Sequence, residues 1–272
     1  MGIDTEDIVK TSLNLVNWGS LPADSNVHVR GDNICKALIA IDVSIAELML
    51  AKNLGCDAVI AHHPIGISAL NFHKVIDRHA EYMVENGIPE GLAAEATLKL
   101  KERVRIRSHA SIYDQVVHAA KVLGLPLVNI HQPCDEFMRR TILERIIAGS
   151  TEYVSDIIKS VESIAEFKNV ETKVETVFGS SNNRTGRWAL VVAAGTNGGY
   201  PIAKIYFQHG IDTVIYLHID YNEVIKMQNE QVHGNLIILG HLAGDSIGLN
   251  ALADKLEETG IETVRVGIIS SK

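Results

Sequence analysis

Short runs of apolar, mostly β-branched residues recur along the chain, separated by longer segments with helical spacing. Three of these runs, at 57–61, 212–217 and 235–240, have the length and composition typical of buried parallel strands. Two further runs, at 37–42 and 188–194, open the first and second halves of the chain. Strands that alternate with helical segments indicate βαβ units and a mainly parallel sheet.

The two halves share a weak internal duplication. The segment 55–63, GCDAVIAHH, aligns with 210–218, GIDTVIYLH, and the two have Gly, Asp, Val, Ile and the final His in common. Each half also contains a later run that we interpret as a strand ending in His, at 104–109 and at 236–241. The sequence therefore predicts an α/β fold of two related lobes with mainly parallel or mixed sheets.

We expect the first α/β lobe at 1–135 and the second at 187–272. A block at about 72–101, rich in Glu, Lys and Ala, predicts a helical insertion in the first lobe. Residues 136–186 combine a helical stretch, an alternating stretch and a polar turn, and we interpret them as a linker or insert region.

Histidines follow several of the predicted strands. His62, His63, His218 and His241 each come at the end of an apolar run. Ligands of open α/β sheets bind outside the carboxyl ends of the strands, so we expect these rings to converge. A packed or solvated histidine explains any one of them, but several imidazoles with carboxylates nearby indicate a metal site.

His62 and His63 are adjacent and precede Pro64. Successive residues of an extended strand face opposite sides, so the two rings cannot share one ligand position while the strand stays extended. Pro64 takes the chain out of the ladder, which allows the rings to reach two different ions. Two adjacent histidines in an apolar context are costly to desolvate unless both have a partner. Two neighbouring metals would give each ring a partner, so the pair predicts two metals.

Acidic residues follow the other two predicted strand-end histidines. Asp114 lies five residues after His109, and Asp245 lies four residues after His241. Either acid could cap a nearby helix, but their matching positions favour ligation, with a carboxylate bridging two ions. Asp42, after the first predicted strand, is either a turn residue or a partner that orients an imidazole ligand.

Several other features carry weaker signals. Cys35, Cys56 and Cys134 have no Cys-x-x-Cys spacing, which favours reduced thiols, and we expect Cys134→Ser to change neither metal content nor thermal stability. The glycine-rich loop at 195–199 could hold phosphate, although a tight turn is the simpler interpretation. Seven histidines lie in polar or helical contexts, and we interpret them as surface residues: His28, His73, His79, His118, His131, His209 and His233.

The composition narrows the range of partners. The 272 residues are 46% hydrophobic, which is ample for one large α/β domain or two smaller lobes. With 25 Lys and Arg against 33 Asp and Glu, the net charge is −8, so nucleic acid is a disfavoured partner. The sequence shows neither a secretion signal nor an apolar stretch of membrane-spanning length, and we expect a cytoplasmic protein without a membrane partner.

These motifs resemble the Nif-three-like family of dinuclear-metal proteins, also labelled GTP cyclohydrolase type 2 homologues. The resemblance covers most of the chain and rests on the segment 60–64, Ile-Ala-His-His-Pro, and on the two His-then-Asp pairs. It implies two α/β lobes, two divalent metal ions (Zn, Mn, Fe or Co) in the cleft between them, and a ring-shaped homohexamer. Carried over position by position, the metal ligands are His62, His63, Asp114, His241 and Asp245.

The chain departs from the family pattern at two positions. The family usually has Glu where Asp245 stands, and because the carboxylate here is one methylene shorter, contact with only one metal is the alternative to bridging both. The family's first His-to-Asp spacing is usually four residues, whereas His109 and Asp114 are five apart.

Two divalent ions can lower the pKa of a bridging water and hold an electrophile's oxygen. This chemistry favours a metal-dependent hydrolase acting on a nucleotide-like, phosphoester or cyclic amidine substrate, with His109 or His218 moving protons. One alternative is a non-catalytic metal-binding hexameric scaffold or interaction protein, whose ions have no open coordination position. Another is a nucleotide-binding module that uses the loop at 195–199.

Overall fold

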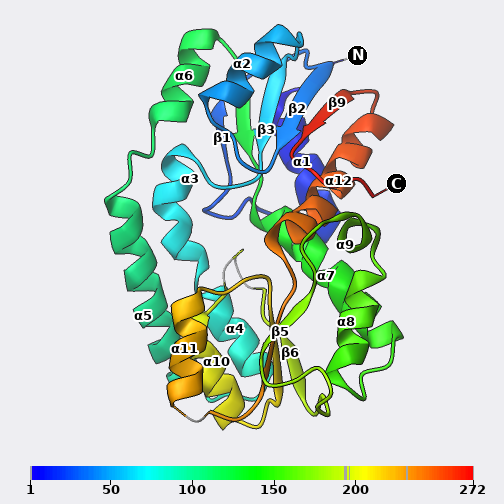
Figure 1. Ribbon diagram of the computed structural model, residues 1–272. Coiled ribbons are helices and arrows are strands. Elements are labelled where there is room, and N and C mark those ends of the chain that lie inside the picture. The colour runs from blue at the N-terminus through cyan, green and yellow to red at the C-terminus, as the bar shows by residue number, and fades with distance from the viewer. Residues whose placement is uncertain (1, 193–194, 196, 231, 272) are drawn as a thin grey trace. The chain divides into compact units, whose positions relative to one another are not determined.

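A computed structural model describes residues 2–192, 195, 197–230 and 232–271 (Figure 1). Within these residues the strands form two sheets. The first sheet contains β1 (Asn26–Val29), β2 (Lys36–Ala40), β3 (Ala58–Ala61), β4 (Leu127–Asn129) and β9 (Glu262–Val266). The second sheet contains β5 (Glu175–Phe178), β6 (Trp188–Leu190), β7 (Thr213–Tyr216) and β8 (Asn235–Ile238).

The two sheets have related topologies. The first has the strand order β1-β4-β3-β2-β9 and the second has the order β5-β8-β7-β6. In each sheet three successive strands are parallel, and the preceding strand, β1 or β5, pairs antiparallel with the last of them. The second sheet therefore repeats the first without β9, which agrees with the duplication in the sequence. The predicted α/β class with mainly parallel sheets is confirmed.

The chain folds into two compact units, each assembled from separate segments. Unit 1 contains Met1–Val75, Arg103–Met138 and Asp245–Ser270, and unit 2 contains Ile76–Glu102, Arg139–Gly244 and Ser271–Lys272. The last strand, β9, pairs in parallel with β2, so the chain returns to the first sheet after completing the second.

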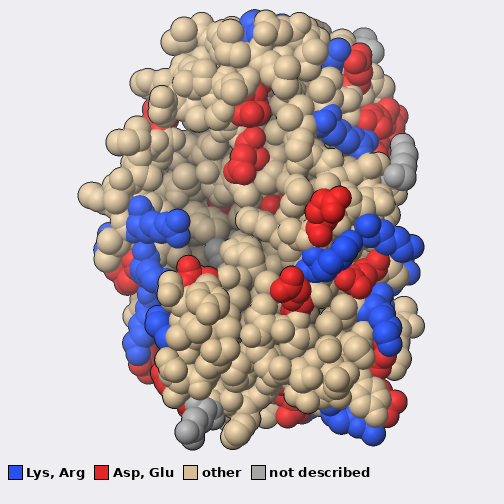
Figure 2. Space-filling model, in the orientation of Figure 1, with Lys and Arg blue, Asp and Glu red and all other residues tan. Residues whose placement is uncertain are grey.

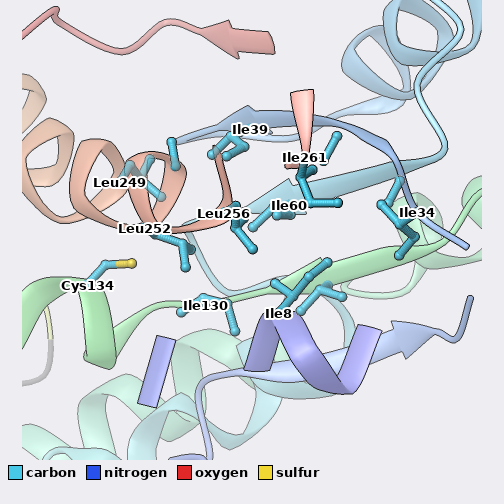
Figure 3. Close-up of a cluster of buried hydrophobic side chains, with 14 of the residues drawn as sticks. Ile8, Ile34, Ile39, Ile60, Ile130, Cys134, Leu249, Leu252, Leu256 and Ile261 are labelled. Carbon is cyan, nitrogen blue, oxygen red and sulfur yellow. The ribbon is translucent and has the colours of Figure 1, made fainter. Parts of the chain in front are cut away.

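The first sheet has helices on both faces. Ile39 and Ile60 pack with Ile8 of α1 (Thr5–Val16) and Leu252 of α12 (His241–Glu258) on one face (Figure 3). Alternate strand residues such as Leu38 pack on the opposite face against α2 (Ile45–Asn53) and α6 (Gln115–Leu123). Because both of their faces are buried, β3 is apolar throughout and β2 is apolar from Ala37 to Ala40, which explains why these two strands could be found from sequence.

The other helical elements lie between the strands. They are α3 (Gly66–Asn71), η1 (Phe72–Val75), α4 (Arg78–Glu85), α5 (Glu90–His109), α7 (Gln132–Ala148), α8 (Val154–Glu162), α9 (Ala165–Asn169), α10 (Gly199–Gln208) and α11 (Tyr221–Asn229). The block at about 72–101 contains η1, α4 and the first part of α5. Among the described residues, none of the helices combines the length and apolar character needed to cross a membrane.

The strand predicted at 104–109 is wrong, because these residues form the last turns of α5. The alternation of apolar and basic residues there mimics the period of a strand. The buried residues of α5, however, are Ala93, Thr97 and Leu100, whose spacings of four and three are helical. The helix that begins at Glu90 continues through the alternating segment and ends at His109.

Candidate metal centre

His62 and His63 extend the register of β3 by two residues. Their backbone N–H groups donate to the carbonyl oxygens of Ala40 (2.9 Å) and Ile41 (3.0 Å), beside the end of β2. The side chain of His62 is fully buried, whereas that of His63 is 26% exposed. The ring centroids are 5.3 Å apart, so the adjacent rings occupy neighbouring but different positions.

The next strand, β4, supplies two further groups. His131 lies two residues after β4, and Asp135 lies in the first turn of α7. Both are buried, and the ring of His131 lies 4.8 Å from that of His62. The interpretation of His131 as a surface residue is therefore wrong. The sequence does contain a signal for this pair, because the four-residue spacing equals that of His241 and Asp245.

A second carboxylate comes from α12. This helix begins at His241, so Asp245 lies in its second turn rather than at a capping position. Asp245 is buried, and its Oδ2 lies 3.2 Å from Nε2 of His63 and 3.8 Å from Nε2 of His62. One carboxylate oxygen is thus near both adjacent imidazoles.

Each imidazole of this cluster is held at Nδ1 by an oxygen atom. The pairs are His62 with the carbonyl of Ile130 (3.0 Å), His63 with Asp42 Oδ1 (2.7 Å), and His131 with Asp24 Oδ2 (2.7 Å). Carbonyl and carboxylate oxygens accept hydrogen bonds, so Nδ1 carries the proton in all three rings. A neutral ring then has its lone pair at Nε2, the arrangement found in metal-binding histidines. The contact between Asp42 and His63 is the orienting role considered for Asp42 from sequence.

The three Nε2 atoms face carboxylates. Besides the two contacts of Asp245, Nε2 of His62 lies 3.3 Å from Asp135 Oδ1, and Nε2 of His131 lies 3.4 Å from Asp135 Oδ2. Nε2 of His62 and both carboxylate oxygens of Asp135 are buried and lack a partner in hydrogen-bond geometry. Lone pairs that face buried carboxylates are unfavourable unless a proton or a cation lies between them.

The electrostatics of the cluster favour positive charge. Burial lowers the pKa of His62, but the carboxylates of Asp245 and Asp135 outweigh it and raise that pKa well above its ordinary value. Two groups of side chains, His62–His63–His131 and His62–Asp135–Asp245, each bring their potential ligand atoms within 4.8 Å of one another. A mixed set of imidazole and carboxylate ligands suits zinc, manganese, iron or cobalt, so these residues fit a divalent transition metal.

Asp114 and His109 have different surroundings. Asp114 precedes α6 and places Oδ2 3.1 Å from Nε2 of His118, and both side chains are substantially exposed. His109 is the exposed last residue of α5. Neither belongs to the candidate metal groups among the described residues. The strand expected to end at His109 is absent, and the roles of both residues stay predictions from the sequence and from its family resemblance.

His218 and His241 belong to unit 2, where their ring centroids are 4.6 Å apart. His218 follows β7 and receives a hydrogen bond at Nδ1 from the side-chain amide of Asn197 (3.1 Å). The amide oxygen of Asn197 accepts from the N–H of Gly199 (2.9 Å), which fixes the orientation of the amide. A neutral His218 therefore carries its proton at Nε2 and can donate it.

Comparison with known proteins identifies the fold. A NIF3 superfamily protein from Sphaerobacter thermophilus is 39% identical, with a TM-score of 0.94 over 98% of both chains. Reduced HcgD from Methanocaldococcus jannaschii has a TM-score of 0.61 at 13% identity, over 97% of this chain and 98% of its own. A Bacillus cereus protein related to NIF3 has a TM-score of 0.54 at 10% identity, over 97% and 96%. The last two similarities concern the fold alone.

No protein-family model matches the sequence, and no curated protein matches it. The identity to the Sphaerobacter protein nevertheless extends over almost the whole of both chains and agrees with the resemblance in the sequence motifs. The chain therefore belongs to the NIF3 superfamily.

Proposed function

We propose that the protein is a hydrolase that depends on two divalent metal ions, held at His62, His63, Asp135 and Asp245. The observation that supports this most is the direction of the imidazoles. Each Nδ1 is engaged by an oxygen acceptor, while each Nε2 faces a carboxylate. Cations between these nitrogen and oxygen atoms would satisfy both at once.

The geometry around Asp245 supports two ions rather than one. Its Oδ2 lies within 4 Å of Nε2 in both His62 and His63, and the rings of these residues diverge. A carboxylate in this place can contact one ion beside His62 and another beside His63. His241, four residues earlier on α12, is at a spacing that puts two side chains on one helix face, and it stays a predicted ligand.

Asp135 takes the ligand place that the sequence prediction gave to Asp114. Its carboxylate is buried next to His62, whereas the carboxylate of Asp114 pairs with His118 at the surface. The four-residue spacing from His131 to Asp135 is also the spacing expected of the family.

Bound at this centre, two divalent ions would supply a water of lowered pKa and a Lewis acid for an electrophile's oxygen. The residues of the chain fix the geometry, because Asp42 and the carbonyl of Ile130 hold the His63 and His62 rings by hydrogen bonds. Partial exposure of His63 and near-complete exposure of Asp42 make this the accessible side for substrate. A phosphoester, a nucleotide-like compound or a cyclic amidine fits this chemistry, with His218 as a candidate proton donor.

A metal-binding scaffold is the second candidate, and one observation favours it. Helix α2 exposes the apolar side chains of Ile45, Met49 and Leu50, and Leu54 follows directly after it. In Figure 2, the visible surface of unit 1 around α2 has few Lys, Arg, Asp or Glu side chains. Exposed apolar clusters often mark protein interfaces, so we propose that the chain assembles as a homo-oligomer, by family resemblance a hexamer. Light scattering that gives a monomer contradicts this assembly.

Metal content is the direct test of the proposed centre. Elemental mass spectrometry of untagged protein, purified without chelator, should give about two transition-metal ions per chain. His62→Ala should lose metal, whereas His118→Ala, a matched change of an exposed histidine in the same unit, should keep it. Absence of metal even after reconstitution would overturn the proposal.

Activity separates the two candidates. Metal-loaded protein should hydrolyse at least one member of a panel of phosphoesters, nucleotides including GTP, and cyclic amidines. The rate should show a limb near neutral pH, and chelator should abolish it. Two bound ions without activity on any member of the panel favour the scaffold.

A further inference from the structure

We propose that His131 is itself a metal ligand and that, with His62, Asp135 and Asp245, it forms a closed four-ligand site for one of the two ions. The inference rests on the proposed metal centre and adds to it. The ligands expected from family resemblance do not include His131, and the sequence alone marked it as a surface residue.

The distances from Asp135 to the two imidazoles are close to those between ligands of a tetrahedral ion. With metal–ligand bonds of about 2.0–2.2 Å, the ligand atoms of a tetrahedral ion lie roughly 3.3–3.6 Å apart. Asp135 turns one oxygen to each ring, 3.3 Å from Nε2 of His62 and 3.4 Å from Nε2 of His131. Asp245 Oδ2 lies 3.8 Å from Nε2 of His62. The imidazoles of His62, His63 and His131 also bring their potential ligand atoms within 4.8 Å of one another, so His131 lies within reach of an ion bound beside His62.

The orientation of His131 also points to ligation. Asp24 is fully buried, and its Oδ2 accepts the Nδ1 proton of His131 at 2.7 Å. The loop of Asp24 is fixed in turn, because its carbonyl accepts from the Asn129 amide (2.9 Å) and the Ser25 hydroxyl oxygen accepts from the His131 N–H (2.8 Å). Nε2 of the neutral ring thus has a lone pair directed at Asp135. Histidine ligands of metals are commonly held in this way by a carboxylate.

A site closed by four protein ligands should exchange its metal ion slowly. Structural metal sites use four protein ligands, whereas catalytic sites keep an open position for water or substrate. His62, His131, Asp135 and Asp245 are all nearly inaccessible to solvent, whereas His63 is partly exposed. The ion beside His131 should therefore be released slowly, and the ion beside His63 should exchange quickly.

Chelation kinetics test this difference. Zinc-loaded wild-type protein is mixed with excess EDTA, and the metal transferred is followed over time. We expect two phases of about one ion each, with rates that differ at least about tenfold. His63→Ala should lose the fast phase and keep the slow one. His131→Ala should lose the slow phase, and the control His118→Ala should keep both.

Spectroscopy separates ligation from a merely positioning role. In cobalt-substituted protein, His131→Ala should alter the visible bands of the slowly released ion. Asp24→Asn leaves the imidazole in place and should keep those bands while weakening affinity by about 10–100-fold. X-ray absorption of wild-type protein that retains only the slow ion should show two imidazole ligands, and this readout does not depend on any variant folding.

The possible failures are distinguishable. A slow ion with one imidazole ligand, or an unchanged cobalt spectrum in folded His131→Ala, overturns the role of His131 and leaves the metal centre intact. Wild-type protein that binds no ion overturns the metal centre itself. Circular dichroism of each variant establishes that it is folded.

Discussion

Gly248 of α12 lies directly against the backbone of Cys134 in α7. A Cβ atom added to Gly248 would lie 2.3 Å from the carbonyl oxygen of Cys134, closer than any real contact. Asp245 stands one turn before Gly248, and Asp135 is the residue after Cys134. The missing side chain thus allows the two helices to approach until both carboxylates reach His62.

We predict that Gly248→Ala destabilises the protein and weakens metal binding. The methyl group meets backbone atoms that cannot rotate away, so α12 must shift, at a cost of about 1–3 kcal/mol. The matched control is Gly91→Ala in α5, where a Cβ meets nothing within 4 Å. A lower conformational entropy of the unfolded chain should stabilise that variant by about 0.4–1 kcal/mol. Chemical denaturation measures the stability of each variant, and zinc titration measures its metal affinity. A Gly248→Ala variant that is stabilised as much as Gly91→Ala contradicts the role of Gly248.

The central strands could be predicted because their residues are buried on both faces. Runs such as Ala58–Ala61 and Thr213–Tyr216 are buried at every position, so a short apolar run is itself the signal. The segment 104–109 resembled a strand for a different reason. Long basic side chains alternate there with apolar residues, and only the preceding turns of α5 reveal the helical face.

The candidate site was only partly predictable, because one of the strands that carries it is short. His62, His63 and Asp245 stand in recognisable motifs, and the structure brings them together in unit 1. His131 follows β4, a strand of three residues whose signal is weak in sequence. Yet β4 holds in the first sheet the place that β8 holds in the second, and an aspartate follows each histidine by four residues. The duplication, applied to the whole sheet, would have identified Asp135.

Metal removal should lower the thermal stability of the wild-type protein. An ion that binds the folded state and not the unfolded chain stabilises the fold by about 2.7 kcal/mol when its free concentration is a hundred times its dissociation constant. Differential scanning fluorimetry with added zinc or EDTA should therefore give separate melting temperatures. In His62→Ala the difference between the two temperatures should be smaller than in wild type, because the ion beside His62 is lost, whereas His118→Ala should behave as wild type. A zinc-dependent shift of wild-type size in His62→Ala would sink the ligand role of His62.

Cys134→Ser should keep its metals but lose stability, which revises the expectation from sequence. Cys134 is fully buried, and its sulfur points into the apolar cluster between α12 and the sheet (Figure 3). Burial raises the pKa of its thiol, against an opposing contact with His62, so the group is a neutral thiol. A serine hydroxyl at this place costs about 1–3 kcal/mol in desolvation. Denaturant unfolding measures the expected loss of stability, and elemental analysis measures the metal that is kept. Loss of an ion would instead indicate that the Cys134 thiol is a metal ligand.

His79 should make the protein less stable in mild acid. It is fully buried in α4, and this burial lowers its pKa from 6.5 to about 4. Between these two values the unfolded chain binds a proton that the folded protein does not, so stability falls as the pH drops from about 6.5 towards 4. The full difference corresponds to roughly 3 kcal/mol. His79→Leu removes the titrating group, so its stability relative to wild type should rise by up to that amount on acidification. Urea unfolding of both proteins in the same metal state measures this, because the opposite contribution of His62 to the pH dependence is common to both and cancels. A difference in unfolding free energy between the two proteins that stays constant from pH 7 to pH 4.5 contradicts the prediction.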